Sequence, residues 1–382
     1  MPITFVVSTG RAGSTLLSRM LALHPQVLSV SEFFSVLQGI LRRYPYPDQD
    51  MDGAGLWRLV TAPDALADAM IRNGQAVPEM FYPYGTGRFK PETGIPNICH
   101  STLSLLSDDA DSLYDELAAV VPAWPVRPAA DQYRALFGLL ADLLGRPVII
   151  ERSGGSIIMI KKLREQFPEA RFVFMYRDGV DTALSMSQFP MFKLGMLVVR
   201  AAEQAGLPVN ATMDEIQASL PDEFAGVLSP PYDLSGLPAM RMSPVQFGKR
   251  WSAMIRYGTS ALAELPAHAR GQLGYEDLLA DPGAELTRLA AFLGVPAEQD
   301  WLDASAKLIA GDRGGTGRAG GGAGAGAGAG RAGTGRAGAA RALDPDVAAQ
   351  LREACAPGYE ALAAFLASAP DPDVSRTPAE GA

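Results

Sequence analysis

The sequence predicts an α/β protein with a central parallel sheet and helices on both faces. Short β-branched apolar runs alternate with helical patterns, which is typical of parallel strands buried on both sides. The first such run leads through a glycine-containing loop into a helix, as at the front of nucleotide-binding α/β units. The 382 residues are 48% hydrophobic and 20% charged, which excludes a disordered, collagen-like or disulfide-rich chain.

Four strands and their helices are predicted in chain order. The strands cover residues 3–8, 27–30, 147–151 and 171–176. Helical patterns follow at residues 14–23, 157–167 and 179–187. Further helices are predicted at residues 243–265, 282–293 and 344–366, with an edge strand at residues 272–275.

Two long stretches, residues 44–131 and 189–244, interrupt this pattern with proline and glycine. Both keep large apolar residues that need burial, so neither is a linker. We expect insertions within one domain of residues 1–312 that cover the carboxyl edge of the sheet and build an acceptor pocket. The alternative is a set of helices that only enlarge the core.

Residues 313–341 are glycine and alanine interrupted by five arginines, without any acidic residue. The hexapeptide Gly-Thr-Gly-Arg-Ala-Gly occurs there twice. Such a tract buries too little side chain to offset its ordering entropy, so we expect it to be mobile and to be the first site of tryptic cleavage. Residues 342–368 are predicted to be a final helix of the same domain, and residues 369–382 a frayed tail.

Charge and residue counts narrow the functional classes. The net charge of −9 argues against a nucleic-acid-binding surface but allows a local basic pocket. Cys99 and Cys355 are far apart and the three histidines are scattered, so we expect neither a disulfide nor a metal site. No apolar run is long enough to span a membrane and no signal peptide is recognisable, which favours a cytoplasmic protein. The oligomeric state is not predicted.

The loop Ser8-Thr-Gly-Arg-Ala-Gly-Ser-Thr15 is the first functional motif. Its glycines let the backbone approach an anion, and its hydroxyls stand at a helix N-terminus, where amide groups and the helix dipole bind phosphate. It is not a Walker A loop, because it has no lysine and Arg11 supplies the charge. Magnesium-dependent nucleotide hydrolysis is therefore disfavoured. The alternative is a turn that serves only packing.

The second motif joins Arg177, at the end of the predicted strand 171–176, to Ser185 on the next helix. An arginine at a strand's carboxyl end faces the ligand crevice of an open α/β sheet. With a serine hydroxyl it can bind a terminal phosphate through charge-assisted hydrogen bonds. The alternative is a surface salt bridge between Arg177 and Asp178, with Ser185 incidental.

Together the two motifs resemble the 3′-phosphoadenylyl-sulfate (PAPS)-dependent sulfotransferase family. Residues 8–17 and 23–25 are similar to its 5′-phosphosulfate loop, and residues 174–179 with Ser185 to its 3′-phosphate element. A third segment, Tyr275-Glu-Asp-Leu278 followed by Pro282 and residues 289–294, matches in order. The resemblance covers about residues 3–40, 147–188 and 245–366 and leaves both insertions uncovered.

The resemblance implies a P-loop-like fold with PAPS as co-substrate and no metal. By it, Arg177 and Ser185 bind the 3′-phosphate, and Tyr275 lies near the adenine, with plain core packing as the alternative for Tyr275. The residues implied to bind the 5′-phosphosulfate are Arg11, Ala12, Gly13, Ser14 and Thr15.

The resemblance also suggests a catalytic base. A branch similar to tyrosylprotein and bacterial carbohydrate sulfotransferases has a glutamate just after the second strand, where this chain has Glu32. Phe33 and Phe34 flank it, and desolvation by their rings would raise its pKa toward a useful value. The alternative is an ordinary helix-start glutamate. His24 falls on the first predicted helix, and His100 and His268 have poorly defined surroundings.

Two further positions match the family less well. Arg152 stands at the end of the third strand, where the family more often has lysine, and would act in catalysis with Arg11 by stabilising charge on the leaving oxygen. Glu151 is its competing salt-bridge partner. Arg336 is in register with the cofactor-binding arginine of the family's final lid, but this chain has alanines where the family has an aromatic residue.

The sequence thus predicts transfer of a sulfuryl group from PAPS to the hydroxyl of a small-molecule or lipophilic acceptor, with Glu32 as general base. The apolar residues in 81–84 and 189–192 favour a bulky or lipophilic alcohol. One alternative is a divergent P-loop-like kinase. Another is a non-catalytic nucleotide-binding protein in which Glu32 is structural.

Overall fold

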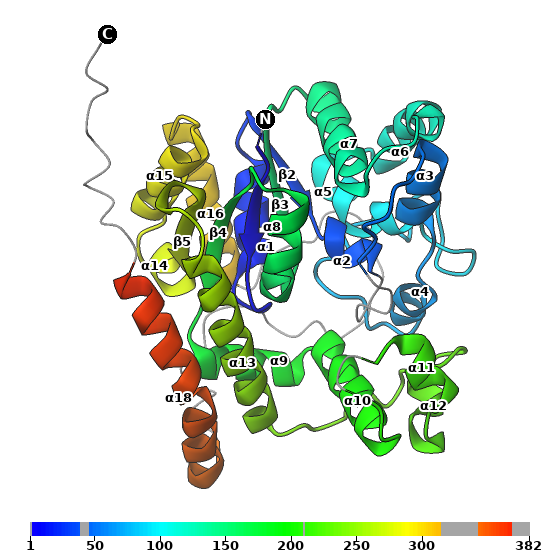
Figure 1. Cartoon of the computed structure of the whole chain (residues 1–382), viewed down its shortest axis with the longest axis vertical. Coiled ribbons are helices and arrows are strands. Elements are labelled where there is room, and N and C mark those ends of the chain that lie inside the picture. Colours follow the sequence, from blue (N-terminus) through cyan, green and yellow to red (C-terminus); the bar gives the residue numbers. More distant parts are fainter. Residues whose placement is uncertain (1, 39–45, 209–210, 315–342, 369–382) are drawn as a thin grey trace.

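The computed structural model describes residues 2–38, 46–208, 211–314 and 343–368 (Figure 1). Its centre is a five-stranded, entirely parallel sheet in the order β2-β3-β1-β4-β5. The strands are β1 (Thr4–Val7), β2 (Val27–Ser31), β3 (Val148–Arg152), β4 (Arg171–Tyr176) and β5 (Arg270–Gly274). The predicted fold class is confirmed, and β5 is the expected edge strand.

The register of the strands aligns their carboxyl ends. Val6 of β1 pairs with Arg152 of β3, and Ser31 of β2 pairs with the same Arg152. The loop after β1, Glu32 after β2 and the last residue of β3 therefore meet at one edge of the sheet, where ligands bind in open α/β folds.

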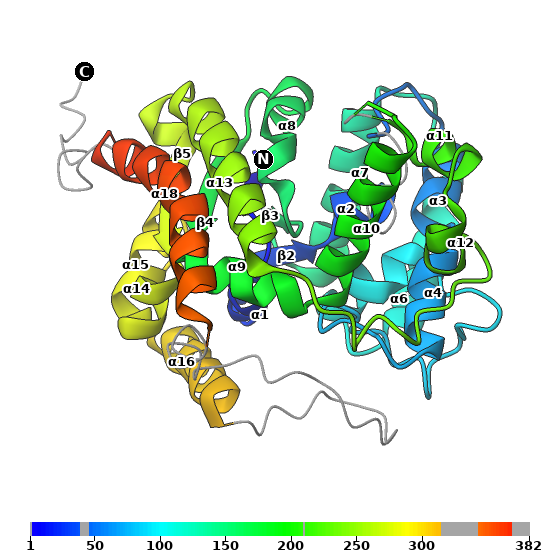
Figure 2. The ribbon, with the colours of Figure 1, turned by 90° about the horizontal axis from the view of Figure 1, so that it is seen from below.

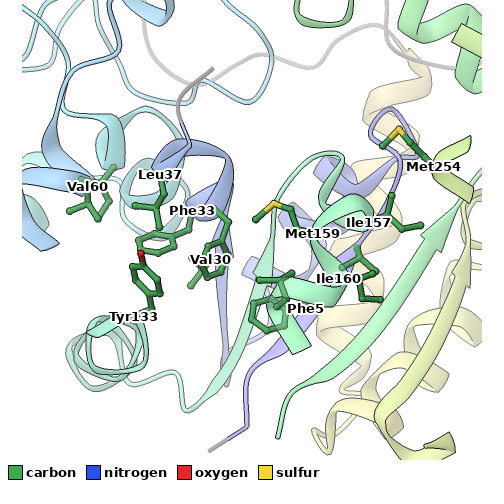
Figure 3. Close-up of a cluster of buried hydrophobic side chains, with 14 of the residues drawn as sticks. Phe5, Val30, Phe33, Leu37, Val60, Tyr133, Ile157, Met159, Ile160 and Met254 are labelled. Carbon is green, nitrogen blue, oxygen red and sulfur yellow. The ribbon is translucent and has the colours of Figure 1, made fainter. Parts of the chain in front are cut away.

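Alternating side chains of the strands divide the core into two layers. Phe5 and Val7 of β1 pack on one face with Phe172 and Phe33, and Val6 packs on the other. Figure 3 shows part of the larger layer, where Phe5, Val30, Phe33 and Tyr133 converge from separate elements. Every residue of β1 is buried, which explains why this strand is mostly apolar and does not alternate between polar and apolar residues.

Helices cover both faces of the sheet, as predicted. The smaller layer is covered by α1 (Ser14–Ala22), α14 (Tyr275–Ala280), α15 (Pro282–Leu293) and α16 (Gln299–Gly314). The larger layer is covered by α2 (Phe33–Leu37), α7 (Ala129–Leu144), η4 (Ser156–Met159), α8 (Ile160–Gln166), α9 (Gly179–Gln188), α13 (Pro244–Ala263) and α18 (Pro345–Ala367). A short 3₁₀ helix, η5 (Ala267–Ala269), precedes β5.

Both interrupting stretches fold into helices beside the β2 edge of the sheet (Figures 1 and 2). The first contains α3 (Gly53–Thr61), α4 (Ala65–Arg72), the π-helical η2 (Cys99–Leu103), α5 (Ser104–Leu106), α6 (Ala110–Val120) and η3 (Val121–Ala123). The second contains α10 (Pro190–Gln204), α11 (Met213–Ala218) and α12 (Asp222–Leu228). Their buried residues, such as Leu56, Met70 and Leu197, join the larger core layer, so the stretches do enlarge the core.

The last helix packs along α13 and reaches α9. Gly248 of α13 lies against Leu351 and Cys355 of α18, and the hydroxyl of Tyr359 accepts the amide hydrogens of Gly179 and Val180. Residues 315–342, with Arg336 and most of the arginine-containing tract, and residues 369–382 lie outside the described residues. Within the parts that are described, no helix is both long and apolar enough to cross a membrane.

Candidate functional site

One cavity of about 360 Å³ lies where the carboxyl ends of β1, β2 and β3 meet. The sheet side of its wall consists of Gly10, Arg11, Ser14, Thr15, Glu32, Ser35, Arg152 and Gly154. The first insertion contributes Ala67, Val77, Glu79, Met80, Asn97, His100 and Ser101, and α10 with the residue before it contributes Phe189, Met191, Phe192, Gly195, Val198 and Val199. Arg250 of α13 completes the wall. Both insertions therefore form walls of the cavity that Arg11, Glu32 and Arg152 line, whereas Arg177, Ser185 and Tyr275 are not among its lining residues.

The loop after β1 has an unusual backbone. Gly10, Arg11 and Gly13 all have positive φ angles, of 77°, 56° and 86°. At Gly13 an added Cβ atom would lie 2.1 Å from Cδ2 of Tyr275, so only glycine allows the ring to pack there. Among the described residues, no side chain caps the first turn of α1. Its first amide groups are therefore free to bind an anion.

Residues from both predicted motifs converge beside this loop. Nε of Arg11 donates to Oγ of Ser185 over 3.1 Å, and Nη1 of Arg177 donates to the carbonyl oxygen of Arg11 over 3.3 Å. The guanidinium of Arg177 also lies 4.7 Å from the centre of the Tyr275 ring. Four residues that the sequence assigned to one nucleotide, Arg11, Arg177, Ser185 and Tyr275, thus form one contiguous cluster.

The alternative salt bridge between Arg177 and Asp178 is wrong. Arg177 instead lies 3.6 Å from the carboxylate of Asp181, one turn along α9. The carboxylate of Asp178 caps α9 by accepting the amide hydrogen of Asp181, and it accepts the hydroxyl hydrogen of Tyr359 over 2.6 Å. The carboxylate of Asp178 is therefore bound to the first turn of α9 and to Tyr359 of α18.

Glu32 and Arg152 form an ion pair at the cavity wall. Nη1 of Arg152 donates to Oε1 of Glu32, and Nη2 donates to Oγ of Ser31 over 2.7 Å. The amide of Gly154 donates to the other carboxylate oxygen over 2.9 Å. The side chain of Arg152 is 2% exposed and that of Glu32 is 12% exposed. Glu32 therefore reaches the cavity, with Arg152 buried behind it.

The backbone at Glu32 is strained. Its φ angle is 58°, in the left-handed region that costs a residue with a side chain about 1–2 kcal/mol. Within the described ranges, Arg11 and Glu32 are the two residues other than glycine with positive φ. Such strain concentrates at functional sites. Both residues were predicted to act in catalysis.

Glu151 is not the partner of Arg152. Adjacent residues of a strand point to opposite faces, and the carboxylate of Glu151 instead accepts the hydroxyl hydrogen of Ser153 over 2.6 Å. Complete burial raises the pKa of Glu151 to about 8. Phe33 and Phe34, which we expected to shield Glu32, are fully buried in an aromatic cluster with Tyr133 and Phe137. The contacts of the Glu32 carboxylate are instead with Arg152 and Gly154.

The three histidines differ in their surroundings. His24 is buried away from the cavity lining, with its ring nitrogens bonded to the backbone of Pro296 and Gln26. His268 is exposed on η5. His100 lines the cavity, and burial lowers its pKa to about 4. Among the described residues neither ring nitrogen has a hydrogen-bond partner, although Nε2 lies 3.9 Å from a carboxylate oxygen of Asp68. His100 therefore stays a rival to Glu32 as base.

Sequence reasoning missed two charged residues of the cavity, Glu79 and Arg250. Glu79 lies in the first insertion, where no motif marked it, and it contacts Arg11 and Thr15. Arg250 falls in the predicted helix 243–265, but periodicity alone does not show that it reaches a cavity. In the described part of the chain, no cluster of three or more histidine, cysteine or acidic side chains could hold a metal ion.

No protein-family model matches the chain, and no curated protein matches it. Solved structures do resemble it. The sulfotransferase domain of the olefin synthase from Synechococcus PCC 7002 is 17% identical with a TM-score of 0.42, over 96% of this chain and 94% of that chain. The sulfotransferase domain from the curacin biosynthetic pathway is 16% identical with a TM-score of 0.40, over 79% and 77% of the two chains. A sulfotransferase from Mycobacterium avium is 13% identical with a TM-score of 0.34, over 81% and 67%. All three TM-scores lie below 0.5.

Proposed function

We propose that the protein is a PAPS-dependent sulfotransferase that transfers a sulfuryl group to the hydroxyl of a lipophilic acceptor. The observation that carries this proposal is that the glycine-containing loop, Glu32 and Arg152 line the same cavity. An anion-binding loop, a carboxylate and a buried cation are the groups that this transfer needs at one place.

The described residues fit the co-substrate. The uncapped first turn of α1 and the guanidinium of Arg11 suit the phosphosulfate, since backbone amides at a helix start bind anions. Arg177 and Ser185 would bind the 3′-phosphate, exchanging their present contacts with Asp181 and Arg11 for phosphate oxygens. Tyr275, against Gly13 and Arg177, would border the adenine.

The walls from the insertions fit the acceptor. Val77 and Met80 come from the first insertion, and Met191, Phe192 and Val198 come from α10. An apolar cavity with a few polar groups at one side is the usual form of a small-ligand site, and its volume lies in the expected range of roughly 300–1,000 Å³. The acceptor hydroxyl would lie at the polar side, next to Glu32.

Glu32 is the general base in this proposal. PAPS supplies the sulfuryl group, whose bond to the nucleotide phosphate breaks in line as the acceptor oxygen bonds to sulfur. The carboxylate of Glu32 takes the proton of the acceptor hydroxyl. Arg152 fixes the orientation of that carboxylate and, with Arg11, adds positive charge near the leaving oxygen.

The direct test is product analysis with the full chain. The protein is incubated with PAPS and a panel of medium-chain alcohols, and with ATP and magnesium in a parallel reaction, and both are analysed by mass spectrometry. We expect sulfated alcohol and 3′,5′-bisphosphoadenosine in the first reaction only. Phosphorylated alcohol in the second reaction would identify a kinase instead. Tight binding of bisphosphoadenosine without turnover of any acceptor would identify a non-catalytic nucleotide-binding protein.

A further inference from the structure

Arg250 is a half-buried arginine of the cavity wall that has no counter-ion among the described residues. It lies in the first half of α13, directly before the buried Trp251. Its Nε is buried and makes no hydrogen bond, and within the described ranges no carboxylate lies at ion-pair distance from its guanidinium. Burying a charge without a partner is costly, so such an arrangement calls for an explanation.

The other cations of the cavity differ from Arg250 in this respect. Arg152 is paired with Glu32, and Arg11 lies 3.6 Å from the carboxylate of Glu79. His100 does not add charge near neutral pH, because burial lowers its pKa to about 4. Among the described lining residues, the positive charge of Arg250 therefore remains uncompensated. Burial alone lowers the pKa of this guanidinium, as expected where no acidic group opposes the desolvation.

The surroundings of Arg250 suit a ligand that is apolar except for one anionic group. The part of the cavity wall that comes from α10 is built largely from apolar residues, including Phe192, Val198 and Val199, and Arg200 of α10 donates a hydrogen bond to Gln246, one turn before Arg250. Next to such surfaces water competes weakly for the guanidinium, whose planar donor groups match a carboxylate in a bidentate arrangement.

We propose that Arg250 binds a carboxylate carried by the acceptor, so that the acceptor class is an apolar hydroxy acid rather than a simple alcohol. This inference rests on the proposed function, because it assigns the substrate of the same cavity. The hydroxyl of the ligand would face Glu32 while its acid group binds Arg250. The cofactor phosphates have separate partners in Arg11, Arg177 and Ser185.

Binding without chemistry tests the inference first. The affinities of decanoate, decanol and bisphosphoadenosine for the full chain are measured by calorimetry, for the natural protein and for Arg250→Gln and Arg250→Lys. Arg256→Gln is the matched control, because Arg256 is exposed on the same helix. We expect decanoate to bind the natural protein more tightly than decanol does, and Arg250→Gln to weaken decanoate by about ten-fold or more. Binding of decanol and of bisphosphoadenosine should stay unchanged.

Three outcomes would overturn the inference. These are equal affinities of decanoate and decanol, a loss of decanoate binding in Arg256→Gln as large as in Arg250→Gln, and a loss of bisphosphoadenosine binding in Arg250→Gln, which would assign Arg250 to the nucleotide. Arg250→Lys keeps the charge but not the planar donors, so we expect intermediate decanoate affinity. Melting temperatures of all variants show whether each protein is folded.

Measurements of turnover provide a second test of the inference. A hydroxydecanoate and the matching decanediol are compared as acceptors with PAPS, and Arg250→Gln should raise KM for the hydroxy acid while KM for the diol is unchanged. The absence of sulfated product from both acceptors in the natural protein would count against the proposed function, whereas the decanoate measurement would still stand. Equal KM values for the two acceptors would count against Arg250 alone.

Discussion

The hydroxyl of Thr15 donates a hydrogen bond to Oε1 of Glu79 over 3.0 Å, and Nη1 of Arg11 lies 3.6 Å from the same oxygen. The other oxygen of this carboxylate, Oε2, is buried and has no hydrogen-bond partner in the part of the chain that the structure describes. A negative group from the first insertion therefore contacts two groups that we assign to the phosphosulfate. Glu79 and the sulfuryl donor would compete for Arg11 and Thr15.

Glu79→Gln should tighten the binding of the nucleotide. The amide removes a like charge from the anion site, and we expect the dissociation constant of bisphosphoadenosine to fall about five-fold, equivalent to on the order of 1 kcal/mol at a partly exposed site. Calorimetry at two salt concentrations measures this change, which should shrink at the higher salt. Glu92→Gln, at an exposed position of the same insertion, is the control. Weaker binding in Glu79→Gln would show that the carboxylate supports the loop.

Glu32→Gln should lower turnover by about 10²–10⁴-fold, the usual contribution of a general base. The amide can still accept a hydrogen bond from Arg152 but cannot take a proton from the acceptor. It also leaves the buried charge of Arg152 uncompensated, so the melting temperature should fall as well. The rate must therefore be expressed per folded molecule. A near-normal rate on this basis would transfer the role of base to His100, and His100→Gln would then be the inactive variant.

Arg177→Ala should weaken PAPS binding by roughly 1.5–3 kcal/mol, as expected for hydrogen bonds to a charged group. Adenosine 5′-phosphosulfate, which lacks the 3′-phosphate, should lose much less. The structure adds a control, because Asp181 lies 3.6 Å from this arginine and competes with the phosphate. Asp181→Asn should keep or improve PAPS affinity. Equal losses of both nucleotides in Arg177→Ala would instead assign Arg177 to holding the carbonyl of Arg11.

Glu151 should make the protein less stable as the pH rises. Burial raises the pKa of its carboxyl group to about 8, against 4.5 for an exposed glutamate. The folded protein therefore holds one proton more than the unfolded chain between these values. The stabilisation is complete below about pH 4.5 and is lost as the pH rises through about 8, with a slope of at most about 1.4 kcal/mol per pH unit.

Denaturant unfolding of the natural protein and of Glu151→Gln, measured from pH 5 to about 8.5, tests this linkage. The variant stays neutral, so its free energy of unfolding should fall less steeply. Asp68 and His100, whose pKa values burial shifts to about 6 and about 4, titrate in both proteins and cancel in the comparison. Parallel curves for the two proteins would mean that Glu151 is not protonated in the folded state.

Apolar periodicity and turn-forming residues in the sequence predicted those helices and strands whose boundaries are set by nearby residues. Strand β4 and helix α15 match the predicted residues 171–176 and 282–293 throughout. In both, apolar periodicity and flanking breakers act over a few residues. Helix α10 lies in the stretch 189–244, for which no individual helix was predicted. Its Pro190 stands at the first helical position, where proline is favoured, so here a proline marks the start of a helix.

Only those site residues that lie at the ends of strands could be predicted from the sequence. Glu32, Arg152 and the β1 loop follow or end adjacent parallel strands, so the topology alone brings them together. The acid that pairs with Arg152 could not be chosen from sequence, since Glu151 is its neighbour but points to the other face. Glu79 and Arg250 come from elements whose packing depends on the whole fold, and no local pattern distinguishes them from surface charges.

The left-handed backbone at Glu32 and the buried guanidinium of Arg152 both lower the stability of the fold, although the proposed activity needs both residues. We therefore expect thermostability and activity to conflict at this pair. Replacing a buried ion pair by apolar residues is often neutral or stabilising, and glycine relieves the positive φ. The double variant Glu32→Gly with Arg152→Leu should therefore melt at or above the temperature of the natural protein, and above that of Glu32→Gln, while its turnover is lost. A lower melting temperature than that of Glu32→Gln would show that the pair stabilises the fold. Directed evolution for heat resistance alone would thus tend to remove this pair, and selection on sulfated product would have to run alongside it.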